Sequence, residues 1–201
     1  SKFSLHQRAN VKVVSMDLYA PFKRVIKDKF FNASIVADNF HFTRIVMNAL
    51  DNLRLNLWRN TVGKEKLYFK YLKHSLMKDI SKANSKDVEK LLYAFELSPI
   101  LKYAYYLKQE FLDIKKKSTF EEKESAFKKW LDKADGSTIK EFKTPVKTLR
   151  QWHKYISNSF KLNLSNGPVE GKNNLIKTLK RISFGFRNLK NFRARILLCE
   201  L

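Results

Sequence analysis

Three side chains that could do chemistry stand where the sequence pattern changes. Asp17 directly follows the β-branched run 11–16, and Asp38 and His41 follow a second run at 33–37. Both runs are typical of buried strands, and the carboxyl ends of parallel strands are where such sheets place their ligands. The simpler interpretation makes Asp38 a helix N-cap and His41 a first-turn polar residue. Carboxylates at such an edge would also suit Mg²⁺ or Mn²⁺, which prefer oxygen ligands.

A fourth candidate, Glu170, stands at the head of a basic stretch. Asn166, followed by glycine and proline, is the expected N-cap of a helix over 168–182. No acidic residue lies between Glu170 and Glu200, a one-signed composition that suits a phosphate backbone. The simpler role of Glu170 is to complement the helix dipole. The candidate DNA-binding residues are Lys172, Asn173, Asn174, Lys177, Lys180, Arg181, Arg187 and Arg193.

The overall composition limits the class of protein. The 201 residues carry a formal charge of +22, yet 44% are hydrophobic and 13% aromatic, which excludes a disordered basic tail. Five glycines and four prolines are too few for a sandwich or barrel of many short strands. A single cysteine, Cys199, excludes an intrachain disulfide and a thiolate zinc cluster. Such a charge points to a polyanionic partner, most commonly nucleic acid.

The elements that must position these residues form a short βαβ unit followed by helices. The stretch 21–29 has helical spacing and is long enough to cross over between two parallel strands. From residue 39 onward the pattern is helical, so the expected fold is mostly α with a small β part. Capping patterns at Ser98-Pro99, at Thr144-Pro145 and over 118–121 mark helix starts. The triple lysine 115–117 is expected to be a solvated helix end. The expected helices are 39–59, 64–79, 85–96, 99–117, 119–134, 145–160, 168–182 and 188–198.

Five blocks of the sequence resemble one known family. The blocks at 13–17, 35–41, 165–177, 185–188 and 191–196 are similar to bacterial insertion-sequence transposases of the DDE class, ISL3 type. The resemblance implies an incomplete RNase H-like α/β core of two parallel strands, interrupted by an all-helical insertion. The corresponding parts would be a partial core at 1–44, the insertion at 45–150, and C-terminal helices at 151–201 that complete the core.

The resemblance also implies roles for the candidate residues. Asp17 would be the second catalytic carboxylate and Glu170 the third, both of them metal ligands, with Asp38 and His41 as the accompanying D-x-x-H motif. The complete enzyme would use two Mg²⁺ or Mn²⁺ ions. The family's first catalytic aspartate lies upstream of residue 1, so this chain is expected to be a C-terminal piece that binds the metal weakly or not at all and is inactive alone.

The expected function is therefore that of a DNA transposase whose parent enzyme cleaves and joins DNA at insertion-sequence ends by metal-dependent hydrolysis and transesterification. Its partners would be transposon-end and target DNA, without a membrane or a small-molecule substrate, in the bacterial cytoplasm at the nucleoid; a homo-oligomer on DNA is left open. The alternative is a non-catalytic, basic helical module that binds nucleic acid and whose acids are only caps. Metal-dependent strand cleavage would separate the two.

Overall fold

The computed structural model describes residues 3–162 and 167–199, with side chains in the second stretch from residue 171 onward. The structure is 76% helical with two parallel strands in one sheet, which confirms the expected fold class. Contacts divide the chain into two compact units, Ser1–Asn163 and Leu164–Leu201, and each is described here by itself.

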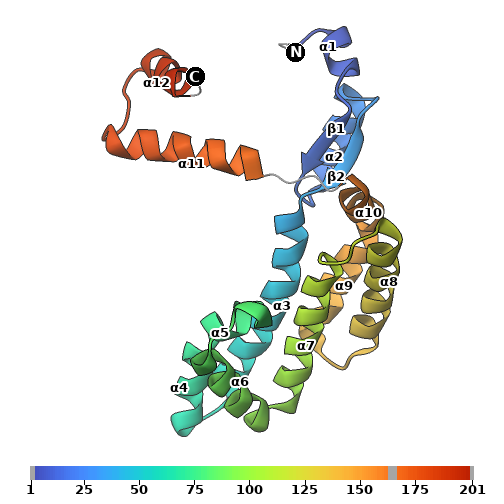
Figure 1. Ribbon diagram of the computed structural model, residues 1–201, viewed down its shortest axis with the longest axis vertical. Helices are drawn as coiled ribbons and strands as arrows, with labels where there is room; N and C mark the ends of the chain where they lie inside the picture. Colours follow the sequence, from blue (N-terminus) through green and yellow to red (C-terminus); the bar gives the residue numbers. More distant parts are fainter. Residues whose placement is uncertain (1–2, 163–166, 200–201) are drawn as a thin grey trace. The chain divides into compact units, whose positions relative to one another are not determined.

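The first unit begins with the expected βαβ arrangement (Figure 1). After the short helix α1 (Leu5–Ala9), the strand β1 (Val13–Met16), the crossover helix α2 (Ala20–Lys29) and the strand β2 (Ser34–Ala37) follow in order. The strands are parallel, with Met16 opposite Ala37. The late helix α10 (His153–Leu162) packs on β2, where the amide of Asn158 donates to the carbonyl of Ile35 at 2.8 Å. A segment far along the chain thus covers the outer edge of the sheet.

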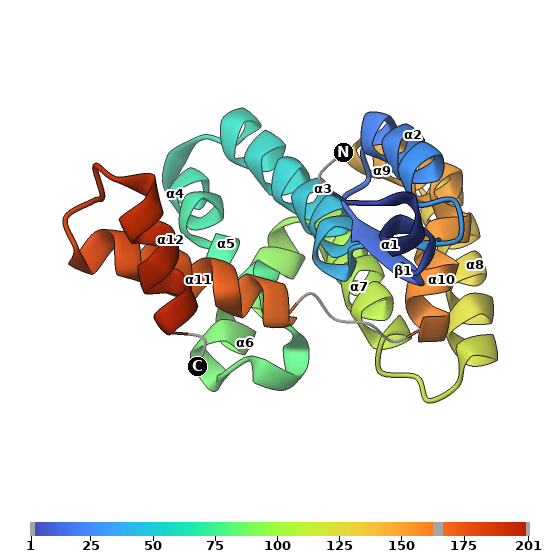
Figure 2. The same cartoon turned by 90° about the horizontal axis from the view of Figure 1, so that it is seen from above.

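A cluster of four long helices forms the core of this unit. The helix α3 (Asn39–Asn60) contacts α7 (Pro99–Ile114) and α9 (Lys140–Gln151), and α8 (Phe120–Gly136) contacts both α7 and α9. In two perpendicular views α8 and α9 lie on one flank of α3 and α4 lies on the other (Figures 1 and 2). The centre is filled by aromatic rings that meet edge to face, such as Phe111 against Phe42 and against Trp130. Such pairs add to the stability that burial of the rings provides.

Three further helices and a 3-10 turn lie at the end of α3 away from the sheet (Figure 1). They are α4 (Gly63–Tyr71), α5 (Lys73–Met77), the 3-10 turn η1 (Ile80–Lys82) and α6 (Ser85–Leu97). The prediction of a single helix over 64–79 is therefore wrong, because the structure has two helices there that are divided at Leu72. The buried Arg54 stabilises the end of α4: its guanidinium donates to the carbonyls of Phe69 at 3.0 Å and Lys70 at 3.4 Å, two of the acceptors that the end of a helix leaves free.

Two further expectations about helix starts need correction. Pro145 lies inside α9, which begins a turn earlier at Lys140, and the expected helix 145–160 is divided at Trp152 into α9 and α10. The early start buries Ile139 and Phe142, a gain that offsets the backbone hydrogen bond a proline removes. The capping box of α8 lies one residue later than expected, with Thr119 as the N-cap and Glu122 as its partner.

The second unit is a pair of helices, α11 (Gly167–Ile182) and α12 (Leu189–Leu198). The ring of Phe186 stacks on Phe192 at 4.7 Å, and the Asn188 side chain caps α12. The expected N-cap of α11, Asn166, lies outside the described residues. No helix in the described ranges is long and apolar enough to cross a membrane.

Candidate functional site

The register of the two strands brings the candidate aspartates together. Asp17 and Asp38 each follow the last residue of a strand, and these last residues, Met16 and Ala37, are paired. The backbone N–H of Asp38 donates to the carbonyl of Met16 at 2.8 Å, which fixes the two strand ends. The parallel arrangement read from the sequence therefore places both carboxylates at one edge of the sheet.

His41 joins them from the first turn of α3. Its Nε2 lies 2.8 Å from Oδ1 of Asp17 and 3.7 Å from Oδ2 of Asp38. One ligand atom from each of the three residues can be chosen so that all lie within 4.8 Å of one another. Asp38 is also the N-cap of α3, since its Oδ1 accepts from the N–H of Phe40 at 3.1 Å. The capping role and membership of a polar cluster are thus compatible.

The three side chains differ in their access to solvent. The side chain of Asp38 is only 8% exposed, whereas those of Asp17 and His41 are 50% and 37% exposed. Asp17 and His41 face a hollow of about 290 Å³ whose wall includes the exposed Arg44. A second hollow, of about 300 Å³, lies on the α2 side of Asp17 and is lined in part by Phe22. An ion or a phosphate can therefore reach Asp17 from solvent, and Arg44 adds a positive charge that the motif analysis did not single out.

Lys115 is a neighbour of this cluster that the sequence analysis misread. It is half-buried rather than solvated, and its Nζ donates to Oγ1 of Thr43, which in turn donates to the carbonyl of Asn39 at 2.6 Å. Burial lowers the pKa of Lys115 to about 8, and the nearby charge of Asp38 partly opposes that shift. Lys116, by contrast, is exposed and pairs with Asp79 and Asp113 at the surface. No local pattern distinguishes the two lysines, because the burial comes from the packing of α7 on α3.

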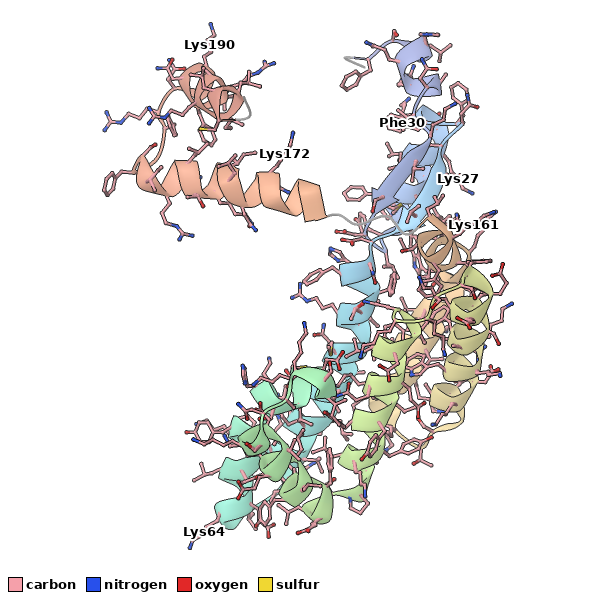
Figure 3. The ribbon with its side chains drawn as sticks, viewed as in Figure 1. Lys27, Phe30, Lys64, Lys161, Lys172 and Lys190 are labelled. Atoms are coloured by element: carbon pink, nitrogen blue, oxygen red, sulfur yellow. The ribbon has the colours of Figure 1, made fainter. Side chains whose placement is uncertain are left out.

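The remaining candidates lie in the second unit. Glu170 belongs to α11, but its side chain is outside the described residues, so the structure gives its place along the helix and no contact. All eight candidate DNA-binding residues, from Lys172 to Arg193, are exposed on α11, α12 and the turn between them. Figure 3 shows Lys172 and Lys190 on these helices. Together the exposed side chains form a surface without a single carboxylate between residues 171 and 199.

Comparison with known proteins identifies the family of this chain. The chain is 33% identical, over 136 residues, to a protein of Lactococcus lactis subsp. lactis named an ATP-dependent protease; the aligned part is 67% of this chain and 39% of that protein. The chain thus spans less than half the length of this relative. No solved structure matches. The sequence model of the ISL3 family of DDE transposases matches residues 1–196. The description of this family is transposase. Since this match extends over nearly all of the chain, the protein belongs to the ISL3 family of DDE transposases.

Proposed function

We propose that this chain supplies part of the catalytic site, and much of the DNA-binding surface, of a transposase that cuts and joins DNA at the ends of an insertion sequence. The observation that carries the proposal is the cluster of Asp17, Asp38 and His41 at the carboxyl end of two parallel strands. Membership of a transposase family supports DNA as the substrate. The charge of +22 supports a polyanionic partner independently of the family.

The donor atoms fit a divalent metal ion. The carboxylates of Asp17 and Asp38 have oxygens within 4.8 Å of one another and offer ligands of the kind that Mg²⁺ and Mn²⁺ prefer, with the His41 imidazole beside them. As the family resemblance implies, Asp17 and Glu170 would be the metal ligands, with Asp38 and His41 next to Asp17. A bound pair of ions would supply charge stabilisation for the attacking and the leaving oxygen of a phosphodiester displacement.

Within this site the chain's own residues have distinct tasks. His41 holds one oxygen of Asp17 and so orients the carboxylate, leaving its second oxygen for a cation. Asp38 fixes the start of α3, and with it the position of His41, through its bond to the N–H of Phe40. Arg44, on the wall of the same hollow, is placed to contact a phosphate. The basic residues of α11 and α12 would hold the DNA backbone.

The Lactococcus lactis relative is named an ATP-dependent protease. ATP hydrolysis by a common phosphate-binding loop needs the pattern G-x-x-x-x-G-K-[ST], and the 201 residues do not contain it. The alternative, a non-catalytic DNA-binding module whose acids are only caps, is not favoured by membership of a transposase family, although Asp38 does cap α3.

Metal binding separates the two candidates. Titration of the chain with Mn²⁺, followed by the loss of the free-ion electron paramagnetic resonance signal, is expected to show weak binding that Asp17→Asn abolishes. Asp28→Asn is the matched control, because Asp28 is an exposed carboxylate that pairs with its neighbour Lys29. If Asp17→Asn binds Mn²⁺ as well as the unchanged chain does, the cluster is not a metal site and the non-catalytic module is favoured.

A cleavage assay completes the test. The family resemblance implies a further carboxylate ahead of Asp17, and residues 1–16 hold no acidic side chain. Because catalytic groups that act as a unit lose nearly all their rate when one is missing, these 201 residues are expected to bind DNA without cutting it. Metal-dependent nicking that Asp17→Ala abolishes would show that a further metal ligand is present among these residues, and Asp38, which ends the neighbouring strand, is the first candidate for it.

A further inference from the structure

Phe184, at the end of α11, has a conformation that a phenylalanine rarely adopts. Its φ is 51°, in the left-handed region, and it is the one residue other than glycine with a positive φ in the described ranges. Its side chain is also fully exposed. A bulky residue in this region is strained, and such strain persists only where the surrounding structure enforces it.

The turn that carries Phe184 is well fixed by hydrogen bonds. The N–H of Gly185 donates to the carbonyl of Lys180 at 2.9 Å, and the N–H of Phe184 donates to that of Arg181 at 3.1 Å, which is the Schellman pattern. In that pattern the first left-handed residue is usually glycine, yet here phenylalanine holds that position and Gly185 follows at φ 94°. The stacked rings of Phe186 and Phe192 join the turn to α12. The exposed ring of Phe184 therefore lies on a turn whose backbone conformation is fixed by hydrogen bonds.

The surroundings of the ring indicate what it contacts. In the described part of its unit no side chain covers Phe184, although an aromatic side chain gains free energy by leaving water. Eight basic residues and no acidic one lie between residues 171 and 199. A polyanion complements that charge, and the apolar faces of nucleic-acid bases complement the ring.

We propose that Phe184 inserts beside a base of double-stranded DNA and unstacks one base step, while the basic residues of α11 and α12 hold the flanking phosphates. The inference rests on the proposed function, because it takes DNA as the partner. Apolar wedges of this kind open base steps, and flexible pyrimidine–purine steps yield most easily. The ligand is thus a deformable step in a duplex rather than a particular sequence of bases.

The test uses the whole chain and duplexes that carry 2-aminopurine, a base whose fluorescence increases on unstacking, at a TA step. The unchanged chain is expected to increase the fluorescence at low salt, and Phe184→Gly to lose most of that increase and bind roughly tenfold more weakly. Phe184→Trp is expected to keep the increase. Leu189→Ala is the matched control, because Leu189 is similarly exposed in the same unit but has no positive φ.

Phe184→Gly also separates binding from folding. Glycine adopts the left-handed region without strain, so this variant is expected to melt at or above the temperature of the unchanged chain. A lower melting temperature would show that the ring packs against protein and would overturn the inference. DNA binding without any change in fluorescence, or with a change that Phe184→Gly retains, would also overturn it while leaving the proposed function intact. A chain that binds no DNA at all would instead contradict the proposed function.

Discussion

Asp38 is the most buried member of the acidic cluster, and its surroundings explain how a carboxylate tolerates that position. A buried charge is costly unless hydrogen bonds or opposite charges compensate it. Asp38 accepts a hydrogen bond from the N–H of Phe40, lies 3.7 Å from the His41 imidazole, and has the charge of Lys115 nearby. The charge of Lys115 at the end of α7 thus helps to compensate a buried carboxylate at the start of α3.

Lys115 gives a prediction at this scale. Its positive charge close to Asp38 repels a divalent cation, so Lys115→Met is expected to bind Mn²⁺ roughly threefold to tenfold more tightly, which corresponds to about 1 kcal/mol. The measurement is the same Mn²⁺ titration. Lys117→Met is the control, because Lys117 is an exposed lysine at the same helix end. Equal or weaker binding by Lys115→Met would show that the contact with Thr43, rather than the charge, is what matters.

Among the helices, α7 contains a lysine in an unusual environment. Lys108 is fully buried; its Nζ donates to the carbonyl of Lys78 at 2.6 Å and lies 4.2 Å from the centre of the Tyr105 ring. Burial lowers the pKa of Lys108 to about 7, and Asp79 opposes this shift only in part. The helix therefore includes a group that is charged in the unfolded chain at neutral pH and only partly charged in the folded one.

The lowered pKa makes stability depend on pH. Between pH 7 and pH 10.5 the unfolded chain keeps a proton on Lys108 that the folded chain has lost, so the contribution of Lys108 to stability increases with pH, by at most about 1.4 kcal/mol per unit. Lys108→Met lacks this dependence. We expect it to be more stable than the unchanged chain near pH 7, with the advantage decreasing as the pH rises.

Urea unfolding at pH 7, 8 and 9 checks this expectation. The substitution leaves the carbonyl of Lys78 with a partner, because the amide of Gln109 also donates to it at 3.2 Å. Lys115, whose pKa is lowered in the same direction, is present in both proteins, so the difference between them isolates Lys108. A difference in stability that stays constant from pH 7 to pH 9 would contradict the assignment.

For the molecule as a whole, the charge distribution predicts how it binds DNA. The eight basic side chains of the second unit are expected to contact phosphates, which carry no sequence information. If six or more phosphates are contacted, affinity for duplex DNA should decrease about a thousandfold or more between roughly 50 mM and 200 mM salt. Fluorescence anisotropy with two duplexes of unrelated sequence measures the decrease of affinity with salt and the small dependence of affinity on sequence. An affinity that is unchanged by salt would exclude this mode of binding.

The catalytic proposal makes a further prediction at this scale, about the distance between Asp17 and Glu170. Asp17 and Glu170 must approach within roughly 10 Å to share a pair of metal ions. Cysteines at these two positions, in a background without Cys199, are expected to be joined rapidly by a short thiol cross-linker. Asp28→Cys paired with Glu170→Cys is the control. If the pair at positions 17 and 170 is cross-linked only as slowly as the control pair, Glu170 does not belong to the site. Substitution of Glu170 would then affect stability alone.

The sequence by itself determined the local structure. The βαβ unit, its parallel strands and the start of α7 at Ser98-Pro99 were predicted, because the hydrogen bonds and apolar periodicity that define them lie within a few residues. The N-cap role of Asp38 was also predicted from its position between a strand and a helix. The family, too, follows from the order of short blocks along the chain, since the match extends over residues 1–196.

The tertiary structure decided which side chains meet and which are buried. The contact of His41 with Asp17 depends on the register of two strands and on the first turn of α3, and the burial of Lys115 and Lys108 depends on how α7 packs. Pro145 lies within a helix whose early start buries Ile139 and Phe142 in the core. In each case the stabilising contacts come from residues that are distant in sequence, so no local sequence pattern predicts them.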